Sequence, residues 1–166
     1  MPVFTGSPGC SRGGEDVRFL ARRLVILASE DVGNADPRAL MVAVAAMQAT
    51  EFVGLPECQL PLSQAVTYLA LAPKSNACTT AIAAAREDVR NRAVIPVPRH
   101  LQDRHSASAK AFGRGEGYRY AHDHPDAIAA QDYLGVEKRY YAPTDRGEER
   151  DLAIRLEEIR RRLAGG

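Results

Sequence analysis

LPLSQAVTYLALAPKSNA, residues 60–77, contains an apolar helix, a break and the start of a second helix. Pro61 suits the first turn of a helix, and residues 65–72 are almost entirely apolar. A helix that is apolar on every side is typical of one surrounded by other helices, so we expect this helix to be buried. Pro73 ends it, and Ser75 is a suitable N-cap for the next helix. The stretch therefore predicts the core of a helical fold.

Helical patterns continue on both sides of this stretch. Asp36 followed by Pro37 predicts the start of a helix that ends at Gly54, and its first half is apolar all round, so we expect this helix to be buried as well. The last helix is expected to begin near Asp145, with Asp145 as its cap and Glu148 reaching back. The sequence predicts helices at residues 16–31, 37–52, 60–72, 75–92, 99–103, 107–112, 127–134 and 145–163.

Two tyrosine-containing segments are the only strand-like pieces. YRY at residues 118–120 and RYY at residues 139–141 could pair as a ribbon packed on the helices. We therefore predict the all-α class, with at most one short two-stranded β-ribbon. Residues 1–14 are rich in Gly, Pro and Ser without a period, which predicts a disordered or loosely packed leader, and residues 15–166 are expected to form one helical domain.

The composition is that of an ordinary globular chain. Its 166 residues are 45% hydrophobic and 26% charged with a net charge of +1, so bulk charge does not indicate a nucleic-acid partner. Cys10, Cys58 and Cys78 match neither a zinc site nor a redox pair, which favours a reducing cytoplasm. No signal peptide is predicted, and the longest uncharged apolar run, residues 39–47, is well short of the roughly 20 residues of a membrane span. We expect a cytoplasmic protein without a membrane partner.

The sequence contains few candidates for catalysis. There is no GxxxxGK[ST] phosphate loop, and GRGEG at residues 113–117 is interpreted as a turn. His122 and His124 could ligate a metal, but the surrounding Asp and Pro residues favour a structural turn. The serines and histidines do not suggest a triad. We therefore predict no catalytic, cofactor-binding or metal site, and a metal enzyme built on the two histidines is the weakest hypothesis.

Two segments combine arginine with tyrosine, a mixture that can hold a phosphate backbone and stack a base. In one interpretation residues 114–120 and 139–146 form a nucleic-acid-binding module. In the other the tyrosines pack an irregular segment onto the helices and the arginines are solvated. The candidate DNA contacts are Arg114, Arg119, Arg139, Tyr140 and Arg146.

The last predicted helix has one apolar stripe between charged faces. The stripe could pack on the core of its own domain or contact another subunit. The candidate interface residues are Leu152, Leu156, Ile159 and Leu163.

Five blocks of the sequence together carry a family resemblance: SEDVGNADPRAL (29–40), LPLSQAVTYLALAPKSNA (60–77), VPRHLQD (97–103), GYRYAHDHP (117–125) and RYYAPTDRG (139–147). Over residues 15–164 the chain resembles the C-terminal domain of the replication-associated recombination protein A family, also called RarA or MgsA. The Werner-helicase-interacting protein is its eukaryotic relative. The resemblance is weaker before residue 15 and at residues 104–115.

This resemblance implies a fold and a function. The family's full-length proteins are clamp-loader-like AAA+ ATPases that act on DNA at stalled replication forks. ATP and Mg bind in a motor domain that precedes this one, so the chain alone is expected not to be an enzyme. The C-terminal domain is expected to be an orthogonal helical bundle, like a clamp-loader collar, that assembles a homotetramer. The full-length protein is expected to bind DNA and to meet single-strand-binding or other replication proteins.

Overall fold

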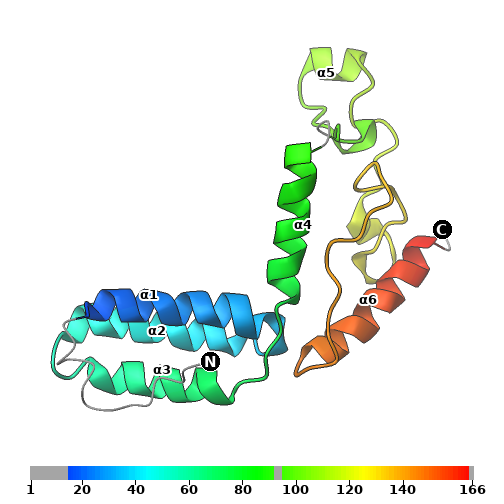
Figure 1. Cartoon of the computed structure of the whole chain (residues 1–166). Helices are drawn as coiled ribbons and strands as arrows, with labels where there is room; N and C mark the ends of the chain where they lie inside the picture. The colour runs from blue at the N-terminus through cyan, green and yellow to red at the C-terminus, as the bar shows by residue number, and fades with distance from the viewer. Residues whose placement is uncertain (1–14, 92–94, 165–166) are drawn as a thin grey trace. The chain divides into compact units, whose positions relative to one another are not determined.

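Three helices, α1 (Val17–Leu27), α2 (Arg38–Val53) and α3 (Gln59–Leu71), lie side by side (Figure 1). The structure is a computed structural model, and it describes residues 15–91 and 95–164. α2 contacts both α1 and α3 most extensively, and α1 also contacts α3, so the three helices of this layer all pack against one another. The leader expected at residues 1–14 lies outside the described residues.

The ends of these helices follow the capping residues of the sequence. Asp16 caps α1 and accepts a hydrogen bond from the backbone N–H of Arg18 at 2.9 Å. The carboxylate of Asp36 accepts the backbone N–H of Arg38 at 3.2 Å, and Gly54, with φ of 74°, ends α2. The Ser75 hydroxyl accepts the N–H of Ala77 at 3.2 Å. The predicted caps Asp36, Gly54 and Ser75 are confirmed.

Small residues form most of the core of this layer. On α2 the buried positions are 39, 43, 46 and 50, which share one helix face and are occupied by three alanines and a threonine. Leu62, Ala65 and Leu69 of α3 and Ala21 and Leu24 of α1 complete the core. Alanine in the contact lets neighbouring helices approach closely, because the interaxial distance depends on the side chains between them.

Complete burial of α2 and α3 was a wrong prediction. Large apolar side chains of both helices are exposed, among them Met41 and Phe52 on α2 and Leu60 and Leu71 on α3. Each helix packs mainly through one face, and its exposed side is partly apolar and is not covered by any of the residues that the structure describes. An apolar helix sequence therefore does not require that the same chain bury all its faces.

The remaining helices are α4 (Ala77–Asn91), the short α5 (Ala107–Ala111) and α6 (Glu149–Ala164). Single 3₁₀ turns lie at Arg99–Leu101, Ala121–Asp123 and Pro125–Ala127. The chain divides into two units, Met1–Ala83 with Tyr141–Leu152 and Ala84–Tyr140 with Ala153–Gly166, called here the first and second units. Over the described residues the fold has six α-helices and no strand, so the all-α prediction is confirmed.

Several local predictions for the irregular half of the chain were wrong. The ribbon between residues 118–120 and 139–141 does not form, because the side-chain amide of Gln131 bonds both the N–H and the C=O of Arg119, each at 3.0 Å. The α-helix expected at residues 127–134 does not form: residues 128–134 are irregular, and Asp126 and Ala127 have positive φ values that an α-helix does not allow. α6 begins at Glu149 rather than near Asp145.

No helix in the described part of the chain combines the length and hydropathy needed to cross a membrane.

Candidate assembly surface

The outer face of α2 is apolar at both ends. Positions 41, 45, 48 and 52 share a helix face, and all four side chains are exposed. Met41 is 70% exposed and Phe52 is 93% exposed. A phenylalanine left almost wholly in water forgoes the roughly 1.5–3 kcal/mol that its burial would contribute. The packing of residues 15–91 and 95–164 therefore gives no reason for Phe52 to be apolar.

α3 repeats this arrangement with the same spacing. Leu60 and Leu71, eleven residues apart, are 73% and 83% exposed, and the polar side chains of Gln64 and Thr67 lie between them on the same face. The buried residues Leu62, Ala65 and Leu69 occupy the opposite side. α3 thus has one face for its own core and a second, partly apolar face in solvent.

The turn between α2 and α3 joins the two faces. Val53 and Leu55 are also exposed in this turn. Together with Phe52 and Leu60 they place four large exposed apolar side chains in the nine residues 52–60. Backbone hydrogen bonds hold this turn, among them Cys58 N–H to Gly54 C=O at 2.8 Å. The α2–α3 apolar surface is defined here as Met41, Phe52, Val53, Leu55, Leu60 and Leu71. Exposed apolar patches of this kind mark interaction sites in soluble proteins.

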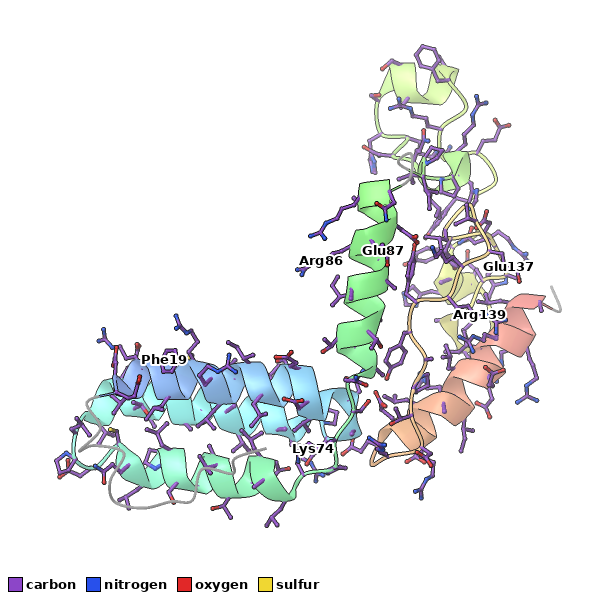
Figure 2. All side chains as sticks on the ribbon, in the orientation of Figure 1. Phe19, Lys74, Arg86, Glu87, Glu137 and Arg139 are labelled. Carbon is purple, nitrogen blue, oxygen red and sulfur yellow. The ribbon has the colours of Figure 1, made fainter. Side chains whose placement is uncertain are left out.

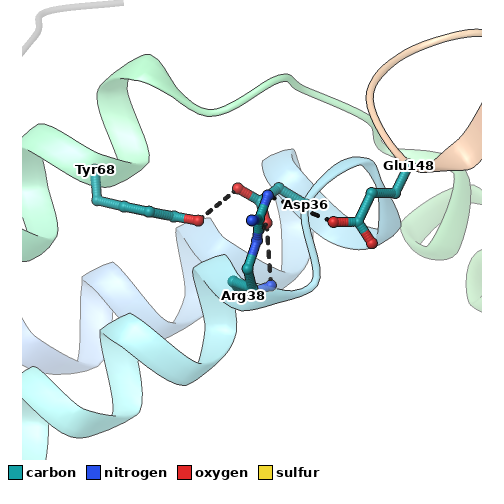
Figure 3. A network of polar contacts seen from close by, with 4 residues as sticks. All are labelled: Asp36, Arg38, Tyr68 and Glu148. Carbon is teal, nitrogen blue, oxygen red and sulfur yellow. Dashed lines mark hydrogen bonds and ion pairs between the residues drawn. The ribbon is translucent and has the colours of Figure 1, made fainter.

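A polar joint ties the start of α2 to α3 and to residue 148 (Figure 3). The hydroxyl of Tyr68 donates to Asp36 Oδ2 at 2.7 Å, and Arg38 Nε donates to Asp36 Oδ1 at 2.8 Å. Arg38 Nη2 also lies 3.4 Å from Glu148 Oε1. Burial raises the pKa of Asp36, but the hydrogen bonds from Arg38 and Tyr68 outweigh it and bring the pKa below its usual value.

A second joint is built on Glu149, whose side chain is completely buried. Its carboxylate accepts the hydroxyls of Ser75 at 2.6 Å, Thr144 at 2.7 Å and Tyr141 at 2.8 Å, together with the Thr144 N–H at 2.8 Å. Asn34 in turn donates to the Tyr141 hydroxyl at 3.2 Å. Burial raises the pKa of Glu149, and these hydrogen bonds more than compensate, so its pKa is lowered.

Both joints are closed structural networks rather than reaction centres. Asp36 accepts three hydrogen bonds and Glu149 accepts four, and no buried side-chain nitrogen or oxygen in the described residues lacks a partner. Both carboxylates accept several hydrogen bonds from residues of the same chain, which accounts for their burial without a catalytic role. The role of both networks is structural, because they hold residues 141–149 against the helical layer.

The sequence gave no local signal for Glu149. It follows another glutamate at the start of an amphipathic helix, where acidic residues are ordinary. Its donors come from residues 60–77 and 139–147, and Asn34 of residues 29–40 donates in turn to the Tyr141 hydroxyl, so three of the blocks that carry the family resemblance take part. That coincidence was the available signal, and only the folded chain shows the carboxylate at which the blocks meet.

The candidate DNA contacts are divided between the units. Arg114, Arg119, Arg139 and Tyr140 belong to the second unit, and Arg146 belongs to the first. The four arginines are exposed, with Arg119 donating to the carbonyl of Ala130 and Arg146 to that of Lys74. The half-buried Tyr140 donates to Asp88, and Lys138 pairs with Asp88 and lies over the Tyr140 ring. Their role in DNA binding stays a prediction.

The α6 stripe is partly covered. Leu156 and Ile159 are half-buried, while Leu152 and Leu163 are each 37% exposed. These side chains are therefore less exposed than Met41, Phe52, Leu60 and Leu71. The stripe stays a candidate interface, and the α2–α3 apolar surface is the more exposed of the two.

His122 and His124 lie in and beside a 3₁₀ turn, with the His122 ring 5.1 Å from the Tyr120 ring. Within residues 15–91 and 95–164 no three His, Cys, Asp or Glu side chains are grouped closely enough to hold a metal ion.

Comparison with known proteins gives a consistent result. The model of the family described as MgsA AAA+ ATPase C terminal matches residues 11–160. An uncharacterized AAA domain-containing protein of Mycobacterium tuberculosis is 53% identical over 150 residues, which is 89% of this chain and 33% of that protein. Replication-associated recombination protein A of Escherichia coli K12 is 47% identical over 147 residues, or 86% of this chain and 33% of that protein.

The protein of the same name in Haemophilus influenzae is 44% identical over 151 residues, which is 89% of this chain and 34% of that protein. The chain thus spans about a third of the length of the curated relatives it matches.

Proposed function

We propose an assembly function for this chain, which belongs to the family of MgsA AAA+ ATPase C-terminal domains. In this proposal the chain joins the subunits of a ring-forming ATPase into a homotetramer, and the α2–α3 apolar surface is where one copy meets another. The single observation that supports it most is the 93% exposure of Phe52 and 83% exposure of Leu71 on helices whose opposite faces form the core.

A second copy of the same chain is a natural occupant of such a surface. Most soluble oligomers are homo-oligomers, and their interfaces have an apolar centre rich in aromatic side chains and methionine. Phe52 and Met41 are residues of that kind, and Gln64 and Thr67 supply polar groups between the leucines of α3. Burial of each large apolar side chain contributes about 1.5–3 kcal/mol toward the free energy that association costs.

The wider activity is assigned to the longer protein of the family. Two of the relatives are named for replication-associated recombination. We infer that a full-length protein containing this domain acts on DNA in that process. We assign ATP and Mg²⁺ binding to its AAA+ motor, because the present sequence has no phosphate loop. The chain itself is proposed to have no catalytic activity.

A paired substitution tests the assembly function. Phe52→Ser with Leu60→Ser removes two apolar anchors without touching the core, and the double variant is expected to elute as a monomer in size-exclusion chromatography. Val89→Ser is the matched control, since Val89 is 76% exposed but lies outside the α2–α3 apolar surface. A double variant with an unchanged mass and an unchanged circular dichroism spectrum would remove these residues from the interface.

A further inference from the structure

The segment from Arg99 to Arg119 concentrates positive charge in a nearly neutral chain. It contains four arginines and one lysine against one aspartate and one glutamate, a net charge of +3, whereas the whole chain has a net charge of +1. The rest of the chain therefore has a net charge of −2. This segment, called here the α5 loop, belongs to the second unit and carries the short helix α5 (Figure 1).

Close backbone packing brings three arginines of the α5 loop together. The N–H of Gly115 donates to the carbonyl of Arg99 at 2.8 Å. A Cβ atom added at Gly115 would lie 2.7 Å from Cδ of Arg104, so the stem of Arg104 lies directly over this glycine. Arg114 is the neighbouring residue. Gly115 has φ of 71°, and both this φ and the nearness of Arg104 require glycine here.

None of these three arginines is neutralised within the described part of the chain, where no carboxylate forms an ion pair with them. Asp103 is the nearest acidic residue in sequence to Arg104, and its carboxylate pairs with the ring of His105. The guanidinium groups are thus available to an anionic partner. Arginine binds phosphate with paired donors in a rigid, planar geometry.

An exposed aromatic residue belongs to the same loop, two residues before Arg114. Phe112 follows α5 directly and is 73% exposed, although Ala109 in the same short helix is buried. Tyr118 and Tyr120, next along the chain, are 49% and 54% exposed. Exposed aromatic side chains among unpaired arginines are the combination that binds single-stranded nucleic acid, in which bases stack on the rings and cations hold the phosphates.

We propose that the α5 loop binds single-stranded nucleic acid, with Phe112 stacking on a base and Arg99, Arg104 and Arg114 contacting the phosphates. The selection of nucleic acid over other polyanions rests on the proposed function. Single strands fit better than duplex, because a protruding phenyl ring needs an unpaired base face and makes no hydrogen bonds to base edges. An acidic peptide would use the arginines without needing an aromatic ring.

Fluorescence anisotropy with a labelled oligo-dT of about 20 nucleotides tests this proposal at low salt, with the matching duplex and a poly-glutamate peptide as competitors. The single strand is expected to bind more tightly than the duplex. Phe112→Ala is expected to weaken binding about fivefold or more, and Phe112→Leu by a similar amount, since leucine keeps the apolar surface but cannot stack. The double variant R104A/R114A should lower the salt dependence by about 1.4 in the log–log slope.

The matched control is the double variant R22A/R23A, which removes two exposed arginines of α1. No binding of the single strand, equal effects of the α1 and α5 arginine pairs, or full affinity of Phe112→Leu would overturn the proposal, as would poly-glutamate competing as well as the oligonucleotide. The mass of each sample is measured in parallel. A monomer that binds through Phe112 would contradict the assembly function alone, and a tetramer that does not bind would contradict the α5 loop alone.

Discussion

At the scale of single residues, Glu149 is the best example of a group whose importance only the fold reveals. It is an acidic residue at a helix start, yet it is fully buried and accepts four hydrogen bonds from Ser75, Tyr141 and Thr144. The free-energy cost of burying this carboxylate is offset by the four hydrogen bonds that it accepts. Losing the carboxylate leaves those donors without partners.

Glu149→Ala is therefore expected to lower the free energy of unfolding by about 3 kcal/mol or more, because hydrogen bonds to a charged group contribute roughly 1.5–3 kcal/mol each. Urea denaturation at neutral pH measures the difference. Glu148→Ala is the neighbouring control, since Glu148 is exposed and makes one long contact to Arg38, and its loss is expected to cost less than about 1 kcal/mol. Equal effects of the two variants would show that Glu149 is not a special joint.

The pH dependence of stability follows from the same residue. The pKa of Glu149 is lower in the folded state than in the unfolded chain, as is that of Asp36. Both groups thus contribute stability above the unfolded values of about 4, and the contribution is lost as the pH falls through the folded values. Urea midpoints measured from pH 6 down to pH 3 should decrease, and the decrease should be smaller in Glu149→Gln, which cannot titrate. A constant midpoint over this range would contradict the assignment.

At the scale of elements, residues 141–149 are held to the rest of the first unit by backbone contacts as well as by side chains. The N–H of Glu148 donates to the carbonyl of Ala35 at 2.9 Å, and Gly147, with φ of 53°, lies against the same carbonyl. At the end of α3, the ammonium group of Lys74 donates a hydrogen bond to the carbonyl of Leu69 at 2.8 Å; Lys74 is labelled in Figure 2. A cation here satisfies the unpaired carbonyls of the last helical turn.

Two glycine substitutions separate crowding from backbone strain. Gly147→Ala would place a Cβ 2.0 Å from the Ala35 carbonyl oxygen, whereas Gly54→Ala meets nothing within 4 Å, and both positions have positive φ. We expect about 1 kcal/mol of destabilisation at Gly54 and at least two to three times as much at Gly147. Thermal unfolding of the two variants makes the comparison. Equal losses would show that residue 147 is not pressed against Ala35.

The elements also show where sequence reasoning succeeds and where it stops. The starts and ends of α2 and α4 were predictable because Asp36, Gly54 and Ser75 act locally on the backbone. The helix expected at residues 127–134 fails because Asp126 and Ala127 have positive φ. The ribbon at residues 118–120 was not predictable, because the side chain of Gln131 satisfies the backbone of Arg119. Local propensity cannot anticipate a hydrogen-bond partner twelve residues away.

At the scale of the whole molecule, the sequence correctly predicts that α2 and α3 are apolar helices, but the prediction that the same chain buries them on every side is wrong. The sequence shows that Phe52 and Leu71 are apolar, but it does not show whether their own chain or a partner buries them. The blocks that carry the family resemblance supply most residues of the two polar joints, but of the α2–α3 apolar surface they contain only Leu60 and Leu71. The five candidate DNA contacts do not all lie within one unit, because Arg146 belongs to the first unit and the other four belong to the second.

The mass of the wild-type chain in solution tests the central proposal most directly. Light scattering after size-exclusion chromatography, across a concentration series from the low micromolar range upward, reports the number of 18.0 kDa chains in each particle. We predict a mass that approaches four chains as the concentration rises, because assembly removes Met41, Phe52, Leu60 and Leu71 from water. A mass of one chain at every concentration would contradict an assembly function for this chain.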